Sequence, residues 1–397
     1  MSVAGPAPAA QRRWWHTAGA WLAIGTSPAA LVLGAGVADR HDGPMPLITL
    51  LLSGAAMAAL LLVQGRLGVL PPYGEGWPLS DVLDGYLPRR DRTLVSLLMA
   101  LSMVGWLGFN AGLGGAALAS LLDAPRWLGV GVLGLPLLVL ALAGQHRWNG
   151  PAVLTTAAAL ALVGLVAIRG AETTVPVTAR LDAPALLLAD VSVFVGYVSV
   201  FALRAPDFTA GLRGRGDLRA CAVVLVVPTL VAAAAGTTVA LRGGSSDLVA
   251  HLQASTLGTA LIAVAVVAPS LTAYHSGGLA LRSVTPLSGR SATLAVGVAG
   301  LALATSGFES VLLPWLTVLA AVLPPLVVPL AVEAHARRRG RGHRVVLAMW
   351  LPAAGLGLVL TAFGVTGAPL VGLAAAGVST AVARAMHRRA LRRRAIP

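Results

Sequence analysis

Charged residues are scarce in this sequence, and one kind is missing altogether. Only 11% of the 397 residues are charged, lysine does not occur, and the single cysteine is Cys221. One cysteine excludes an internal disulfide and any metal site built from cysteines, and its apolar surroundings are typical of a small core residue. The charge content lies far below that of soluble domains, in which about a quarter of the residues are charged.

Long apolar runs take the place of the missing charge. Hydrophobic residues make up 57% of the chain and the mean hydropathy is +0.82, which indicates an integral membrane protein. The runs lack the strict alternation of barrel strands, and a helix of about 20 residues crosses roughly 30 Å of hydrocarbon. We therefore expect an all-α membrane protein with about twelve transmembrane helices, at 18–38, 45–65, 94–122, 127–144, 151–169, 184–203, 219–241, 255–275, 291–306, 311–332, 344–363 and 368–386.

Arginine supplies the positive charge that orients such a chain in the cell membrane. With both termini cytoplasmic, all but five of the 29 basic residues lie on the cytoplasmic side, a strong positive-inside bias. The net charge of +14 raises nucleic acid as a partner, but the clusters RRRGRGHR (337–344) and HRRALRRR (387–394) adjoin apolar runs, so membrane lipid is the expected partner. The five arginines left outside are Arg40, Arg126, Arg169, Arg180 and Arg242.

No soluble domain fits between the apolar runs, since the longest intervening stretch is roughly 66–93. The protein therefore works inside the membrane, and we expect a transporter rather than an enzyme, with no organic cofactor. We expect one transporter domain over 1–397, with inverted five-helix repeats at 18–169 and 184–332 and two extra helices at 344–386.

Helix-weakening residues occur in the first member of each proposed repeat. They lie in IGTSPAALVLGAG (24–36) and in VFVGYVSVF (193–201). Pro28 removes a backbone donor, and a helix broken there exposes carbonyl and amide groups that can serve a cation or a polar ligand. An ordinary proline kink with close glycine packing is the alternative.

Four stretches resemble a known family. They are VGWLGFNAG (104–112), FALRAPDFTAGLRGRGDLRACAVVLVVPTL (201–230), LTAYHSGGLALRS (271–283) and WLTVLAAVLPPLVVPLAVEA (315–334). In order and spacing they resemble the nucleobase:cation symporters (the purine/cytosine permease family), and within them the cytosine-permease branch. The resemblance implies twelve helices with two inverted five-helix repeats, and a permease that imports cytosine or a related flat nitrogen heterocycle.

The resemblance also implies an aromatic ligand site. Trp106 falls on the position that stacks against the heterocycle, and Gly105 and Gly108 would allow close approach. Tyr197 is the candidate for the opposing face, with Phe194 and Phe201 one turn away on either side. Aromatic stacking contributes on the order of 1 kcal/mol beyond the buried area. A tryptophan that only fills a gap in the core is the alternative.

Polar positions of the family pattern are altered in this chain. The glutamine one turn before the tryptophan is Met103, the asparagine of the eighth span is apolar near Ala268, and one of two hydroxyls for sodium is Leu271. Either other groups contact the base, or the ligand is hydroxymethylpyrimidine, a purine, allantoin or a hydantoin; a non-transporting sensor or partner protein on the same fold is a further alternative. Candidates for binding the substrate are Ser27, Asn110, Tyr274 and His275, and those for a sodium ion are Gly25, Thr26, Ser270 and Thr272.

Three ionisable side chains near span ends have more than one interpretation. His275 would carry a coupling proton in place of sodium, or bond a carbonyl as an interfacial histidine. Asp190 is most simply in contact with water at the outer end of the sixth span. Asp207 would pair with Arg213 or Arg215 in a gate or hinge on the cytoplasmic side.

Overall fold

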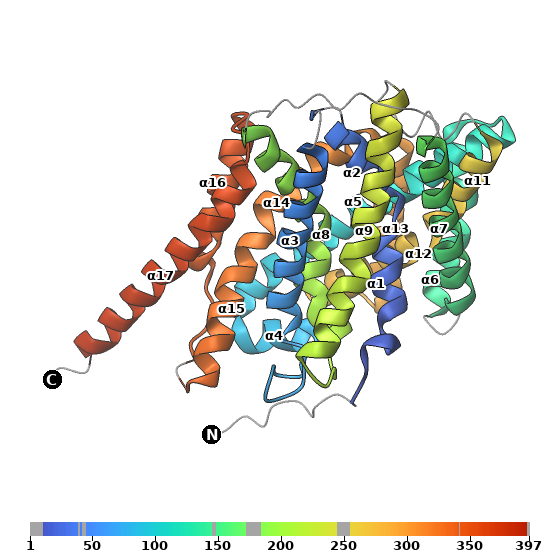
Figure 1. The fold of residues 1–397 in the computed structure, drawn as a ribbon. Helices are drawn as coiled ribbons and strands as arrows, with labels where there is room; N and C mark the ends of the chain where they lie inside the picture. The colour runs from blue at the N-terminus through green and yellow to red at the C-terminus, as the bar shows by residue number, and fades with distance from the viewer. Residues whose placement is uncertain are drawn as a thin grey trace.

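The computed structural model is built from helices (Figure 1), and it describes residues 11–38, 40–41, 45–144, 148–171, 184–243, 255–340 and 342–394. Arg180 and Arg341 lie outside the described residues, as do the side chains of Arg169 and Arg242 and those of the cluster 387–394. The one bridge among the described residues joins Arg12 to Leu212.

The membrane crossings agree with the expected all-α class. In the described part of the chain, ten helical segments are long and apolar enough to span a bilayer, and two shorter apolar helices, α13 and α16, lie at the other two predicted crossings. The α-helices are α1 Ala18–Gly25, α2 Pro28–Ala38, α3 Met45–Gly65, α4 Leu79–Tyr86, α5 Arg89–Leu122, α6 Arg126–Ala143, α7 Asn149–Ala171, α8 Pro184–Thr209, α9 Arg215–Gly243, α11 Thr256–Ala265, α12 Val267–Arg282, α13 Gly289–Thr305, α14 Leu312–Val322, α15 Pro324–Arg338, α16 Leu351–Ala362 and α17 Ala368–Arg394. Short 3-10 helices occur at Trp14–His16, Phe308–Val311 and Leu347–Met349.

Burial separates central helices from those that face lipid. In both α5 and α8, 72% of the most apolar window is buried inside the protein, whereas the values are 33% for α7 and 22% for α17. Figure 1 shows α17 leaving the bundle at an angle on the side opposite α6 and α7, with the start of α1 and the end of α17 at the same, lower end. The central position of α5 and α8 brings Trp106 and Tyr197 to the middle of the bundle.

Three crossings are interrupted where proline removes a backbone donor. The first breaks between Gly25 and Pro28, which confirms the predicted break. The eighth breaks at Val266, ahead of Pro269, and the tenth at Leu323, directly before a Pro-Pro pair. A proline cannot donate to the carbonyl one turn earlier, so the ladder of helix hydrogen bonds ends at each of these points.

The sixth crossing is continuous, and the predicted weakening over 193–201 is wrong in this respect. α8 runs unbroken from Pro184 to Thr209, and its one internal proline, Pro206, lies near its end. Gly196 serves close packing instead, because a Cβ there would lie 1.8 Å from the carbonyl oxygen of Leu316 in α14. Glycine weakens a helix and also permits close approach of two helices, and here the second property applies.

The contacts between helices keep the same pattern when each helix of one half is replaced by its counterpart in the other half. α1 and α2 pack on α9 as α8 packs on α3, and α5 packs on α6 and α13 as α12 packs on α13 and α6. Likewise α7 packs on α9 as α15 packs on α3, and α1 on α7 as α8 on α14. This pattern of contacts is the one expected of two five-helix repeats, and α16 and α17 pack beside α14 and α15.

Candidate functional site

A central cavity lies where the broken first crossing meets α5, α8 and α12. Its open volume is small, about 20 Å³, which is room for about one water molecule, so a heterocycle could enter only after the wall opens. Six of the predicted site residues contribute to its wall: Ser27, Met103, Trp106, Asn110, Tyr197 and Thr272. The remaining lining residues are Ala23, Ile24, Phe201, Pro269 and Ala273. Residues from four crossings, up to 250 positions apart in the sequence, thus form one cavity, as expected for a site beside a broken helix.

Aromatic rings form one side of this cavity. The Trp106 ring lies with its centroid 5.7 Å from that of Tyr197 at an interplanar angle of 75°, and 5.7 Å from that of Phe201 at 47°. Phe109 meets the same indole edge to face at 6.1 Å. Because Tyr197 contacts Trp106 edge to face, no flat ligand fits between these two rings until one of them rotates. Phe201, closer to parallel with the indole, is as well placed as Tyr197 to cover a ligand's second face.

Two buried polar atoms that belong to wall residues lack a partner among the described residues. They are the indole Nε1 of Trp106, a donor, and the amide Oδ1 of Asn110, an acceptor. The Asn110 side chain is held by its Nδ2, which donates to the Trp106 carbonyl at 2.7 Å. A buried polar atom without a partner costs about 1–3 kcal/mol, so a ligand that supplies the missing bonds is favoured. All lining residues are described, and none of them carries a charge, which suits an uncharged ligand.

Two predicted ligand contacts lie outside the cavity wall. The Tyr274 hydroxyl donates to the carbonyl of Gly134 in α6 at 2.9 Å, so this fully buried side chain links α12 to the scaffold. The His275 ring packs edge to face on Trp148, with the centroids 5.4 Å apart. Both belong to α12, and its rotation about its own axis places Thr272 at the cavity and these two side chains elsewhere.

The predicted ion-binding residues are only partly brought together. Thr272 lines the cavity, whereas Ser270 is fully buried away from the wall and its hydroxyl has no partner among the described residues. Gly25 lies against α9, since a Cβ there would be 2.5 Å from the Leu225 carbonyl oxygen. The Thr26 hydroxyl donates back to the carbonyl of Leu22 at 2.9 Å.

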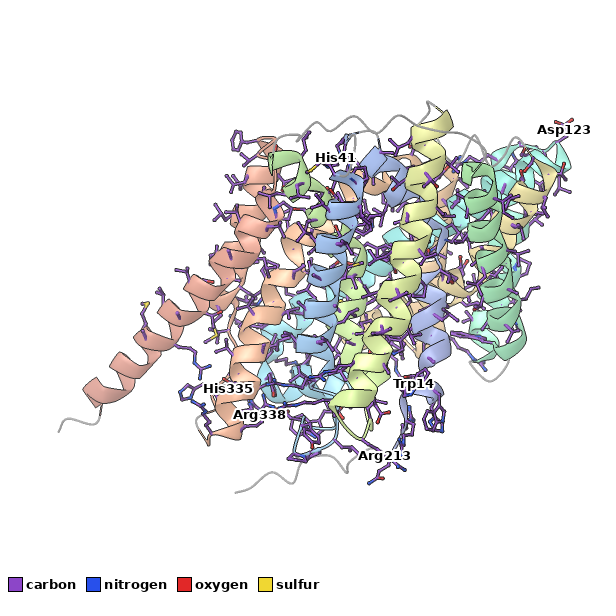
Figure 2. The ribbon with its side chains drawn as sticks, in the orientation of Figure 1. Trp14, His41, Asp123, Arg213, His335 and Arg338 are labelled. Atoms are coloured by element: carbon purple, nitrogen blue, oxygen red, sulfur yellow. The ribbon has the colours of Figure 1, made fainter. Side chains whose placement is uncertain are left out.

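An ion-pair cluster joins the first and sixth crossings at one end of the bundle (upper end in Figure 2, where His41 is labelled). His41 Nε2 lies 2.6 Å from one oxygen of Asp190, and Arg40 Nε lies 2.9 Å from the other. Only 1% of the Asp190 side chain is exposed, so the expected contact with water is wrong. The partners are about 150 positions apart, and sequence reasoning missed them because no local pattern marks them.

At the opposite end, α8 is tied to the short helix α4. Asp207 accepts from the backbone N–H of Leu79 at 2.8 Å and from Arg204 Nε at 3.0 Å. The predicted pairing with Arg213 or Arg215 is wrong, because α8 continues past Asp207 and places Arg204 three residues before it on the same face. Arg213 projects from this end (Figure 2), and Arg215 lies over the ring of Tyr73 at 5.5 Å.

A second network at this end links the segment after α3 to α15. The Tyr86 hydroxyl donates to Glu75, and the Arg337 guanidinium lies 4.0 Å above the Tyr86 ring. Arg337 also pairs with the buried Glu333 at 3.0 Å. Burial raises the pKa of the Glu75 carboxyl above its usual 4.5, although the hydrogen bond from Tyr86 opposes the shift. Burial therefore favours the uncharged form of Glu75, whereas the Tyr86 hydroxyl and the Arg337 charge favour its carboxylate.

The fold is shared with known membrane transporters. Comparison of the sequence with protein-family models and with curated proteins gives no match. Among solved structures, the inward-facing conformation of Mhp1 aligns with a TM-score of 0.69 at 15% identity, over 97% of this chain and 95% of that one. Mhp1, a nucleobase-cation-symport-1 family transporter, in a closed conformation with bromovinylhydantoin bound, gives 0.54 at 16% identity, with 95% of each chain covered.

A transporter with a different cargo has the same fold. A manganese transporter of Eremococcus coleocola aligns with a TM-score of 0.61 at 12% identity, over 96% of this chain and 98% of that one. Identities this low establish a common fold and leave the ligand open. The chain therefore has the broken-helix fold of Mhp1 and the manganese transporter, which are membrane transporters and not enzymes.

Proposed function

We propose that this protein is a secondary transporter that moves a small, uncharged, planar heterocycle by alternating access. The observation that carries the proposal is the central cavity, which a broken helix and the Trp106 ring line together. Supporting it is the fold that the chain shares with Mhp1 over nearly its whole length. Binding sites between a broken helix and its neighbours are the usual place for substrates in such carriers.

The proposed substrate is cytosine or a related nucleobase. A flat ring suits the face of Trp106, and the free donor and acceptor at Trp106 Nε1 and Asn110 Oδ1 suit a neutral ligand that carries both kinds of group. The same features suit hydroxymethylpyrimidine, a purine, allantoin or a hydantoin. Stacking selects weakly among flat rings, so the two polar atoms would account for most of the discrimination.

In the proposed cycle, the ion-pair cluster of Arg40, His41 and Asp190 closes one end of the first and sixth crossings. With both termini cytoplasmic, this end faces outward and the substrate leaves inward. A cation gradient would supply the energy, with ligand and cation stabilising the same occluded state. Sodium and the proton are the two candidate cations, and for the proton His275 is the candidate carrier.

Uptake into cells that express the protein tests the proposal. Labelled cytosine, other pyrimidines and purines are offered to cells with the wild type, with Trp106→Ala, and with the matched control Trp127→Ala, whose ring is 64% exposed. We expect uptake of at least one ring, a loss of about tenfold or more in Trp106→Ala, and no loss in Trp127→Ala. Equal uptake by both variants would exclude the proposed site.

The altered polar positions favour one other candidate, a sensor that binds without transporting. Met103 lines the cavity, and Leu271 stands where the family pattern has a hydroxyl. Tight binding of a heterocycle to purified protein, with no uptake under a sodium or a proton gradient, would favour the sensor over the transporter.

A further inference from the structure

The break in the first crossing is closed by hydrogen bonds from the protein itself. α1 ends at Gly25, and its last carbonyl groups need partners inside the membrane. The Leu22 carbonyl accepts both the backbone N–H and the hydroxyl of Thr26, each at 2.9 Å. The Ile24 carbonyl accepts the N–H of Ser27 at 3.1 Å and the Tyr197 hydroxyl at 2.5 Å. A carbonyl oxygen has two lone pairs, so both acceptors are fully used.

The Tyr197 hydroxyl comes to this break from the unbroken sixth crossing. The side chain is completely buried, and its ring lies on the cavity wall beside Trp106. One phenol thus joins a wall of the central cavity in α8 to the last turn of α1, across 173 positions of sequence. A movement that separates α8 from the last turn of α1 would therefore break this hydrogen bond.

Of the other side chains predicted to hold a cation, Thr272 is engaged, whereas the Ser270 hydroxyl is buried away from the wall and has no partner among the described residues. The Thr272 hydroxyl donates to the Ala268 carbonyl at 3.0 Å. Gly25 packs directly against the backbone of α9, which limits how far the break can open. The cavity wall, described in full, contains no carboxylate that would compensate a cation's charge. Sodium sites in broken-helix transporters use unwound carbonyls, and here sodium would first have to displace the Tyr197 and Thr26 hydroxyls.

We infer that the Tyr197 hydroxyl takes the place of a cation at the break in the first crossing, so that α1, α2 and α8 assemble without sodium. Tyr197 is in this respect a positioning residue, since its hydroxyl bonds protein while its ring contacts the cavity. The consequence for transport rests on the proposed function: substrate binding would be independent of sodium, which leaves the proton as the coupling cation. The assignment of the hydroxyl itself does not depend on any substrate.

Sodium alone is the probe in the experiment that tests this inference. The full-length purified protein in detergent is heated in sodium chloride and in choline chloride of equal ionic strength, and retention of ²²Na⁺ is measured in parallel. For the wild type we expect no sodium-specific retention and a difference in unfolding midpoint of less than about 1 °C, because a ligand stabilises only the state that binds it. Tyr197→Phe keeps the ring and removes the hydroxyl, so one lone pair of the Ile24 carbonyl oxygen loses its donor. This variant should unfold earlier in choline and recover by several degrees in sodium.

Tyr274→Phe is the matched control. Its hydroxyl is equally buried and also donates to a carbonyl, that of Gly134, but away from the break. It should lose stability without any response to sodium, and it shows whether loss of a buried hydroxyl alone causes the effect.

Two results would overturn the inference. The first is sodium-specific retention or stabilisation of the wild type. The second is a Tyr197→Phe variant that responds to sodium no more than Tyr274→Phe does. Neither measurement uses a substrate, so either result would leave the proposed transport function standing, and a failure of the uptake experiment would leave the role of Tyr197 standing.

Discussion

Replacing Gly196 with alanine tests the packing that holds the sixth crossing in place. The new Cβ would lie 1.8 Å from the Leu316 carbonyl oxygen, 2.6 Å from its carbon and 3.1 Å from its Cα. Ordinary contact begins at 3.4 Å, so α8 and α14 must separate locally by about 1.6 Å. The obstacle is backbone and cannot rotate away. Overpacking of this kind costs about 1–3 kcal/mol, which the better helix propensity of alanine offsets by at most about 1 kcal/mol.

The assay is thermal unfolding of the purified variant, followed by size-exclusion chromatography with fluorescence detection. Gly164→Ala in α7 is the matched control, because nothing lies within 4 Å of its added Cβ. We expect Gly196→Ala to lower the midpoint by several degrees and Gly164→Ala to leave it unchanged or raise it. Since Tyr197 is the next residue, a displaced α8 should also weaken its bond to the Ile24 carbonyl, and with it ligand binding.

A Gly196→Ala protein as stable as the wild type and as Gly164→Ala would refute this reasoning. In that case α8 would not be held at this distance from α14, and the glycine would serve to weaken the helix, as the sequence suggested.

Two charge changes give further predictions. Asp190→Asn leaves the Arg40 guanidinium and the His41 ring facing an uncharged amide. Because 31% of the Arg40 side chain is exposed, we expect a cost of about 1–3 kcal/mol and a lower unfolding midpoint. Asp123→Asn, at an exposed position of the same end (Figure 2), should leave the midpoint unchanged, and equal midpoints for the two variants would contradict a structural ion pair. For Glu75, burial raises the folded-state pKa, so the stability that its uncharged form contributes is complete below about pH 4.5 and is lost as the pH rises through the raised value. Glu75→Gln should therefore unfold at a higher temperature than the wild type at pH 8 and at a similar temperature at pH 5. A higher unfolding temperature of the variant at pH 5 alone would contradict a raised pKa of Glu75.

The sequence by itself determined the membrane class, the apolar runs that form the crossings, and the break at Pro28. Crossings follow from run length, because each helix satisfies its own backbone bonds in lipid and its residues are adjacent in the chain. The break follows from one missing N–H, an equally local property. The resemblance supplied the positions of Trp106 and Tyr197, which the structure brings to one cavity.

Only the tertiary structure decided what the ambiguous residues do. Gly196 permits close packing where its sequence context also suited a break, Asp190 meets Arg40 and not water, and Asp207 pairs with Arg204. Tyr197 and Tyr274 look alike in sequence, yet one hydroxyl closes the break and the other joins the scaffold. The physical reason is common to all of them: the rotation of each helix about its axis, and the backbone it faces, arise from packing between segments far apart in the chain, which no local pattern encodes.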